Sequence, residues 1–160
     1  MYSRVIVTVA LQRYIETPPV AIRVRDVGIA LAKEHKAPVD VIAVEAPVEL
    51  LPGVESTEEK LNRFVEPFRN AGIEAHPHML SGKPSEQLLK FLATVDSGTS
   101  LLIIGSHSKR GPLDIGMGST SSALVKDSPC PVLMIWPTRQ EAERAQELMI
   151  PGYPFIFPYG

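Results

Sequence analysis

The segment at residues 105–121 combines residue types that suit binding of an anion. It is rich in glycine, contains Lys109 and Arg110, and ends in the consecutive hydroxyl residues Ser119, Thr120 and Ser121. Glycine lets the backbone approach a ligand closely, and the first N–H groups of a helix are unpaired and lie at the positive end of the helix dipole. If a helix begins near Ser119, this segment is therefore a candidate phosphate-binding loop.

A purely structural interpretation of the same residues stays open. Gly116 and Gly118 would then shape a turn, and Ser119 would cap a helix without any ligand. Neither standard phosphate signature is present, since no Gly-Lys-Ser/Thr follows a glycine loop and no G-x-G-x-x-G occurs.

Four short apolar stretches frame this segment, at residues 5–10, 39–44, 101–105 and 132–136. Their hydrophobicity is continuous rather than alternating, which is typical of parallel strands covered on both faces. A fifth stretch, residues 74–80, contains His76, Pro77 and His78. Because proline lacks the N–H that a central strand donates, we expect this strand at an edge of the sheet.

Helical patterns lie between the strands. The first helix begins at Pro18 and Pro19, and the second begins at Ser56, which forms a capping box with Glu59. Pro67 is expected to kink the second helix or to end it early.

Three further helices are expected along the rest of the chain. The third begins near Pro84 and stops at Gly98, and the fourth covers residues 119–126. The last begins with a capping box at Thr138 and ends at Pro151. Strands and helices thus alternate, which predicts an α/β fold with a Rossmann-like, doubly wound, five-stranded parallel sheet and helices on both faces. Ligands of such sheets bind beyond the carboxyl ends of the strands, here the loops after Val9, Val44 and Gly105.

Composition excludes several classes of protein. Of the 160 residues, 44% are hydrophobic and 21% charged, which is the range of globular domains. The 16 basic and 18 acidic side chains give no general attraction to nucleic acid or to an anionic membrane. Cys130 is the only cysteine, so neither an intramolecular disulfide nor a two-cysteine motif can form. Without a recognisable signal peptide or an apolar run of about 20 residues, we expect a cytoplasmic protein with no membrane insertion.

One spacing in the chain is specific to a known family. The pattern Gly105-x2-Ser108-x9-Gly118-Ser119, followed by a short helix and a last strand that begins Cys130-Pro-Val, resembles the G-x2-G-x9-G-[ST] signature and "CPV" strand of the universal stress protein (UspA) family. The similarity extends over about residues 2–135.

This resemblance implies an adenine nucleotide alpha hydrolase-like fold over residues 1–137, followed by a C-terminal helix and an aromatic, proline-rich tail at residues 138–160. It implies ATP or another adenine nucleotide as the ligand, with Mg²⁺ accompanying the phosphates, and it implies no catalysis. A homodimer paired through the last strand, from Val132 to Trp136, would be the functional unit. The residues that would line the nucleotide site are Val9, Ala10, Ile42, Gly105, His107, Ser108, Gly118, Ser119, Thr120 and Ser121.

Two positions depart from the family pattern. Ser108 replaces the second glycine of the signature, which would cost about 1–2 kcal/mol if that position needs a positive φ. Ala10 stands where the family's first strand ends in an aspartate that reaches the sugar or base of the nucleotide, so that acceptor is missing. Arg13 and Glu16, in the loop that follows, are candidates to replace it.

Three functions remain open from the sequence. The first is a nucleotide-binding stress or signalling module whose state is read by an unidentified signalling partner. The second is a scaffold or interaction protein of the same fold with a degenerate pocket, which Ser108 and Ala10 favour. A slow ATPase is the least supported, because the loop has no Walker lysine and only Asp114 as an acid. His76 and His78 lack a third ligand for a metal, and Cys130 is interpreted as a core residue rather than a reactive thiol.

Overall fold

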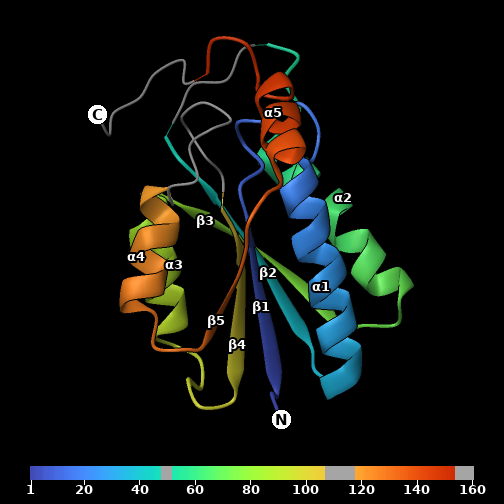
Figure 1. The fold of residues 1–160 in the computed structure, drawn as a ribbon, viewed down its shortest axis with the longest axis vertical. Helices are drawn as coiled ribbons and strands as arrows, with labels where there is room; N and C mark the ends of the chain where they lie inside the picture. The colour runs from blue at the N-terminus through green and yellow to red at the C-terminus, as the bar shows by residue number, and fades with distance from the viewer. Residues whose placement is uncertain (48–51, 107–117, 154–160) are drawn as a thin grey trace.

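The centre of the molecule is a fully parallel sheet of five strands. The computed structural model describes residues 1–47, 52–106 and 118–153. The strands are β1 (Arg4–Val9), β2 (Val39–Glu45), β3 (Ala75–Ser81), β4 (Ser100–Gly105) and β5 (Val132–Ile135), and their order across the sheet is β3-β2-β1-β4-β5. The order changes direction between β1 and β4, which makes their carboxyl ends the expected ligand position (Figure 1). The predicted α/β, doubly wound class is confirmed.

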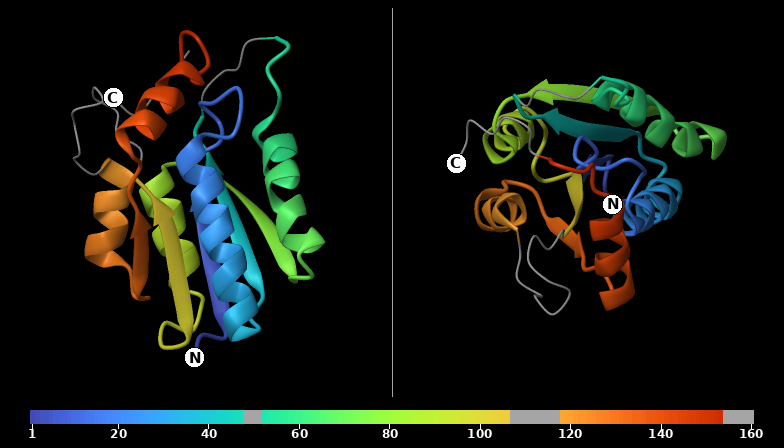
Figure 2. Two further views of the ribbon diagram at one scale, coloured as in Figure 1. Left: turned by 45° about the vertical axis from the view of Figure 1, so that its right-hand side comes forward. Right: turned by 90° about the horizontal axis from the view of Figure 1, so that it is seen from above.

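Helices cover both faces of this sheet, as the two views of Figure 2 show. The helices α1 (Pro19–His35) and α2 (Thr57–Asn70) lie on one face, with α5 (Arg139–Glu147) beside α1, and α3 (Pro84–Leu92) and α4 (Ser119–Asp127) lie on the other. None of the helices in the described parts of the chain is long and apolar enough to cross a membrane.

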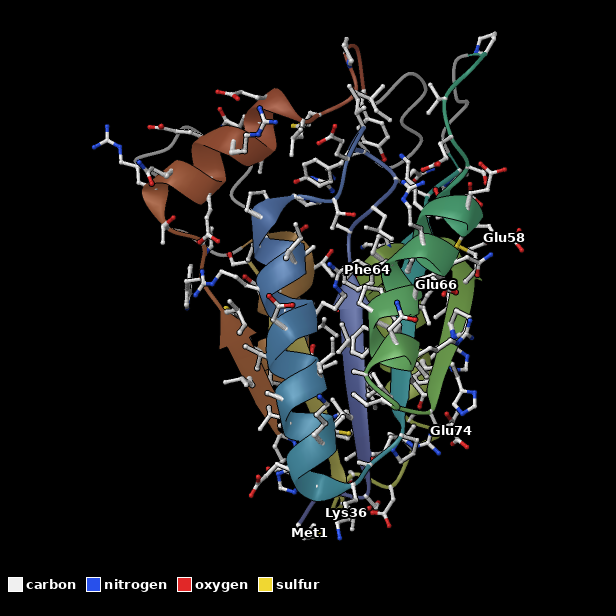
Figure 3. All side chains as sticks on the ribbon, turned by 90° about the vertical axis from the view of Figure 1, so that its right-hand side faces the viewer. Met1, Lys36, Glu58, Phe64, Glu66 and Glu74 are labelled. Atoms are coloured by element: carbon white, nitrogen blue, oxygen red, sulfur yellow. The ribbon has the colours of Figure 1, made fainter. Side chains whose placement is uncertain are left out.

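Each face of the sheet has its own hydrophobic core. On the α1–α2 face, residues such as Val7 and Val41 pack against Phe64 and Phe68 of α2. Figure 3 shows Phe64 on the side of α2 that faces α1, and Glu58 on the far side. On the opposite face, Ile6 and Ile42 belong to the core that α3 and α4 complete. Alternate residues of one strand therefore serve opposite faces, which explains the continuous apolar stretches in the sequence.

The strand that contains proline lies at an edge, as predicted. β3 pairs only with β2 in the sheet, and Pro77 stands opposite Val41. An edge strand tolerates a residue without an N–H because its outer side has no neighbouring strand to receive that donor. The opposite edge of the sheet is β5.

Of the two alternatives for Pro67, an early end of α2 is wrong, because the helix continues to Asn70, and a kink stays a prediction. Proline inside a helix costs about 3 kcal/mol. Phe68 follows the proline and is fully buried, and full burial of such a side chain contributes about 1.5–3 kcal/mol. Packing on the sheet therefore offsets most of the cost of the proline.

The third helix is shorter than the sequence predicted, ending at Leu92 rather than near Gly98. Beyond Leu92 the amides of Thr94 and Val95 donate to carbonyls only three residues back, and the Thr94 hydroxyl also donates to the carbonyl of Phe91 at 2.7 Å. A threonine hydroxyl that bonds its own backbone in this way competes with continuation of the helix.

The C-terminal segment, residues 138–153, returns to the body of the domain. The capping box of Thr138 and Glu141 is confirmed at the start of α5. Arg23 of α1 donates to the carboxylate of Glu141 at 2.7 Å and to the carbonyl of Trp136 at 3.0 Å. Figure 1 shows α5 near the first turns of α1, on the side of the sheet where the strands end.

Candidate functional site

A cavity of about 770 Å³ lies at the carboxyl ends of β1, β2 and β4. Its walls come from those strand ends, from the loop after β1, from the starts of α3 and α4, and from the C-terminal segment. The lining residues are Thr8, Val9, Ala10, Leu11, Gln12, Arg13, Ile42, Val44, Ala46, Lys83, Pro84, Ser85, Leu88, Ile104, Gly105, Gly118, Ser119, Thr120, Ser121, Ala123, Leu124 and Tyr153. A cavity of this size is within the range of small-molecule and cofactor sites.

The structure brings most of the predicted site residues together around this cavity. Val9, Ala10, Ile42, Gly105, Gly118, Ser119, Thr120 and Ser121 all line it. His107 and Ser108 lie outside the described residues, as do Lys109, Arg110 and Asp114. The role of any of these residues in binding a nucleotide stays a prediction.

The start of α4 forms one side of the cavity. Gly118 is the residue before the first turn, and no side chain within the described chain caps it. The Ser121 hydroxyl donates to the carbonyl of Gly105 at 3.5 Å, which joins the start of α4 to the end of β4. The amide of Ser122 donates to the carbonyl of Gly118, so the amides of residues 119–121 precede the first bond within the helix. Gly118 has φ −67° and ψ 165°, which any residue adopts, so its conformation does not require glycine.

The charge of the cavity favours an anion. Arg13 follows β1 and Lys83 precedes α3, and both contribute to the lining. Among the lining residues that the structure describes there is no Asp or Glu. The neutral Ala10 leaves the end of β1 without a carboxylate, and Glu16, one of the two candidates to replace it, does not line the cavity.

Gln12 was missed by the sequence analysis, although it organises the loop after β1. Its side chain is buried, with 6% exposed, and it donates to the carbonyl of Ala46 at 3.1 Å while its Oε1 accepts from the amide of Ala46 at 3.0 Å. These two bonds join the loop after β1 to the end of β2. They also satisfy the main chain of Ala46, so a ligand beside it meets a wall whose polar groups are already paired.

Lys60 was also missed by the sequence analysis, and its side chain binds the main chain of the same loop. This residue of α2 is only 6% exposed, and its ammonium donates to the carbonyls of Tyr14 at 2.6 Å, Leu11 at 3.3 Å and Gln12 at 3.4 Å. Burial lowers the pKa of Lys60 from its ordinary value, and the charge of Glu55 opposes that shift. The sequence has no local signal for this contact, because Lys60 and the loop are 46 to 49 residues apart.

Tyr153 is a third residue of the site that the sequence analysis did not assign to it. It lines the cavity, and its hydroxyl donates to Gln12 Oε1 at 3.4 Å. Burial raises the pKa of Tyr153 above its ordinary value. The sequence analysis placed Tyr153 only in an aromatic, proline-rich tail, of which residues 154–160 lie outside the described chain.

The other residues considered from the sequence lie away from this cavity. His76 contacts Glu74 at 3.1 Å, and His78 contacts the buried Asp40 at 2.8 Å. No group of three or more metal-ligating side chains occurs in the described parts of the chain. Cys130 is buried in the core beneath α3 and α4, and burial raises the pKa of its thiol.

Curated relatives share short stretches of this sequence. Universal stress protein MJ0531 of Methanocaldococcus jannaschii is 26% identical over 87 residues, which cover 54% of this chain and 50% of that protein. Universal stress protein YxiE of Bacillus subtilis is 29% identical over 108 residues, 68% of this chain and 66% of that protein. The aligned part spans about half the length of MJ0531.

Solved structures share the fold over more of the chain. A universal stress protein from Archaeoglobus fulgidus in complex with dAMP superposes with a TM-score of 0.60 at 22% identity, over 84% of this chain and 98% of that one. A universal stress protein family protein from Arabidopsis thaliana with AMP bound superposes with a TM-score of 0.61 at 18% identity, over 86% of this chain and 94% of that one. A universal stress protein in complex with cAMP gives a TM-score of 0.60 at 16% identity, over 84% of this chain and 97% of that one. At these identities the likeness establishes the fold.

Family membership comes from the sequence model. The model of the universal stress protein family matches residues 1–135, which include every strand of the sheet and the first four helices. Only α5 and the residues around it lie beyond the match. The chain therefore belongs to the universal stress protein family.

Proposed function

We propose that this protein binds an adenine nucleotide in the cavity, with the phosphates at the start of α4 and the nucleoside along the ends of β1 and β2. One observation carries this proposal: the lining of a single cavity includes Gly105, Gly118 and residues 119–121 together with Arg13 and Lys83. Unpaired amides at a helix start and two cations attract phosphate, and the apolar Ile42 and Leu88 suit a base. Relatives of the same fold were solved with dAMP, cAMP and AMP, which supports this class of ligand.

Binding without catalysis is the proposed activity. The described lining residues include no carboxylate, imidazole or thiol, the groups that most often act as a general base. They therefore also provide no carboxylate for Mg²⁺, which would be held mainly by the phosphates of the ligand.

The first test is whether a nucleotide accompanies the purified protein. Mass spectrometry of the gently denatured protein is expected to release an adenine nucleotide, and calorimetric titration of ATP, ADP and AMP is expected to give a saturating heat. Ser108→Gly is titrated beside the parent, because restoring the family glycine should tighten binding up to about ten-fold if Ser108 strains the backbone. The absence of heat for every nucleotide at millimolar concentration, in parent and Ser108→Gly alike, would contradict the proposal.

A proposal for the biological role rests on family membership. We propose that the nucleotide state of a cytoplasmic homodimer is read by a signalling partner in a stress response. The dimer would pair through β5, which is an edge strand with Leu133 37% exposed, followed by Trp136 at 45%. An apolar edge strand favours pairing with a second copy.

The dimer predicts a specific light-scattering result. The parent is expected to have the mass of a dimer at micromolar concentration, and Leu133→Lys is expected to be a monomer because it places a charge in the paired edge. His76→Lys is the matched control, since His76 is exposed on β3, the opposite edge of the sheet, and this variant should remain a dimer. A monomeric parent would show that the edge does not pair.

A scaffold role without a ligand is the second candidate, favoured by Ala10 at the end of β1. In that case neither copurified nucleotide nor binding heat would be found, while the dimer would persist.

A further inference from the structure

The C-terminal segment lies outside the part of the chain that matches the family, yet it reaches the cavity. The match ends at residue 135, and Tyr153, which lines the cavity, lies 18 residues later. The universal stress protein domain does not include the residues that form this part of the wall.

Main-chain bonds hold the segment against the loop after β1. The amide of Ile15 donates to the carbonyl of Leu148 at 2.8 Å, and the amide of Ile150 donates to the carbonyl of Arg13 at 2.8 Å. Leu148 and Ile150 are both buried. Two bonds in opposite directions and two buried side chains keep the segment next to Gln12 and Arg13, which themselves line the cavity.

Tyr153 extends this arrangement into the cavity. Its amide donates to the carbonyl of Ile150 at 3.1 Å, which forms a turn, and its hydroxyl reaches Gln12 Oε1 at 3.4 Å. Gln12 is in turn bonded to Ala46 at the end of β2. The ring therefore lies on the β1–β2 side, while the helix start that suits phosphate lies on the β4 side.

We propose that Tyr153 contacts the nucleoside of the bound nucleotide through its aromatic ring and determines the preference of the site for an aromatic base. This inference rests on the proposed function, because phosphates at α4 place the nucleoside towards β1 and β2. An aromatic ring stacks on any base, and the contact needs no carboxylate at Ala10. The polar groups of Gln12 and Ala46 are already paired with each other, so the ring of Tyr153 is the group on this wall that is suited to stacking on the base.

The test is calorimetric titration of AMP into a set of variants at one position. Tyr153→Ala and Tyr153→Leu are expected to raise the Kd about ten-fold, and Tyr153→Phe is expected to stay within about two- to three-fold of the parent. Leucine keeps apolar bulk without a ring, so it separates an aromatic contact from simple packing. Tyr2→Ala is the matched control, since Tyr2 packs against His35 at the opposite end of the sheet, with ring centroids 5.3 Å apart, and this variant should bind AMP like the parent.

The outcomes separate this inference from the proposed function. Hydrogen exchange of residues 139–150 checks that the segment stays docked in each variant, and slowed exchange on adding AMP to the parent is the expected sign of contact. A parent that binds AMP while Tyr153→Leu binds it equally well would overturn the role of the ring and leave the function intact. Equal losses in Tyr153→Phe and Tyr153→Ala would overturn it too, by assigning the effect to the hydroxyl. A parent that binds no AMP would overturn both.

Discussion

Gly118→Val is expected to abolish nucleotide binding while leaving the protein folded. Gly118 precedes the first turn of α4 and lines the cavity, so a branched side chain there would stand between the phosphates and the amides of residues 119–121. Each hydrogen bond to a charged group is worth about 1.5–3 kcal/mol, so losing two weakens binding at least about 100-fold. Because φ at Gly118 is −67°, valine adopts the same backbone without left-handed strain.

The matched control is Gly98→Val. Gly98 also has an ordinary φ, does not line the cavity, and an added Cβ there would lie at an ordinary contact distance, 3.4 Å from the carboxylate of Asp96. Calorimetry with AMP is expected to show no heat for Gly118→Val and the parent's Kd for Gly98→Val, with similar thermal midpoints for both. If Gly118→Val binds AMP as tightly as the parent does, the phosphates are not at the start of α4.

Lys60→Met is expected to lower the free energy of unfolding by about 2–4 kcal/mol. The substitution keeps the aliphatic stem of Lys60 but removes the ammonium that now bonds the carbonyls of Leu11, Gln12 and Tyr14. A buried polar group left without a partner costs about 1–3 kcal/mol. The carbonyl of Leu11 also accepts from the amide of Tyr14, so it keeps a partner when the ammonium is removed.

Urea denaturation measures this loss as a shift of the midpoint at unchanged slope. Lys90→Met is the control, because Lys90 is exposed on α3 and is expected to change the free energy of unfolding by less than about 0.5 kcal/mol. Since Leu11 and Gln12 line the cavity, Lys60→Met should also weaken AMP binding. A midpoint equal to that of the parent would mean that the three carbonyls find other partners at no cost.

Local sequence patterns were enough to predict the elements and their class. Continuous apolar stretches identified β1, β2, β4 and β5, because these strands are covered on both faces. Pro77 placed β3 at an edge, and the caps at Ser56 and Thr138 marked two helix starts. These signals act within a few residues of each other, so they can be recognised without knowing the fold. The end of α3 was mispredicted because a local hydroxyl bond outweighed the helical pattern, and core packing carries α2 past Pro67 to Asn70.

The residues of the site fall into two groups, those that the sequence predicts and those that only the tertiary structure brings together. The glycines and hydroxyl residues of residues 105–121 lie within one short segment, and the sequence by itself determined that this segment is a candidate phosphate loop at the end of a buried strand. The opposite wall depended on tertiary structure. Lys60 meets the loop after β1 across 46 to 49 residues, Gln12 meets Ala46 across 34, and Tyr153 meets Gln12 across 141. No spacing or periodicity encodes such pairs, because each exists only after the strands are in register and α5 has docked beside α1.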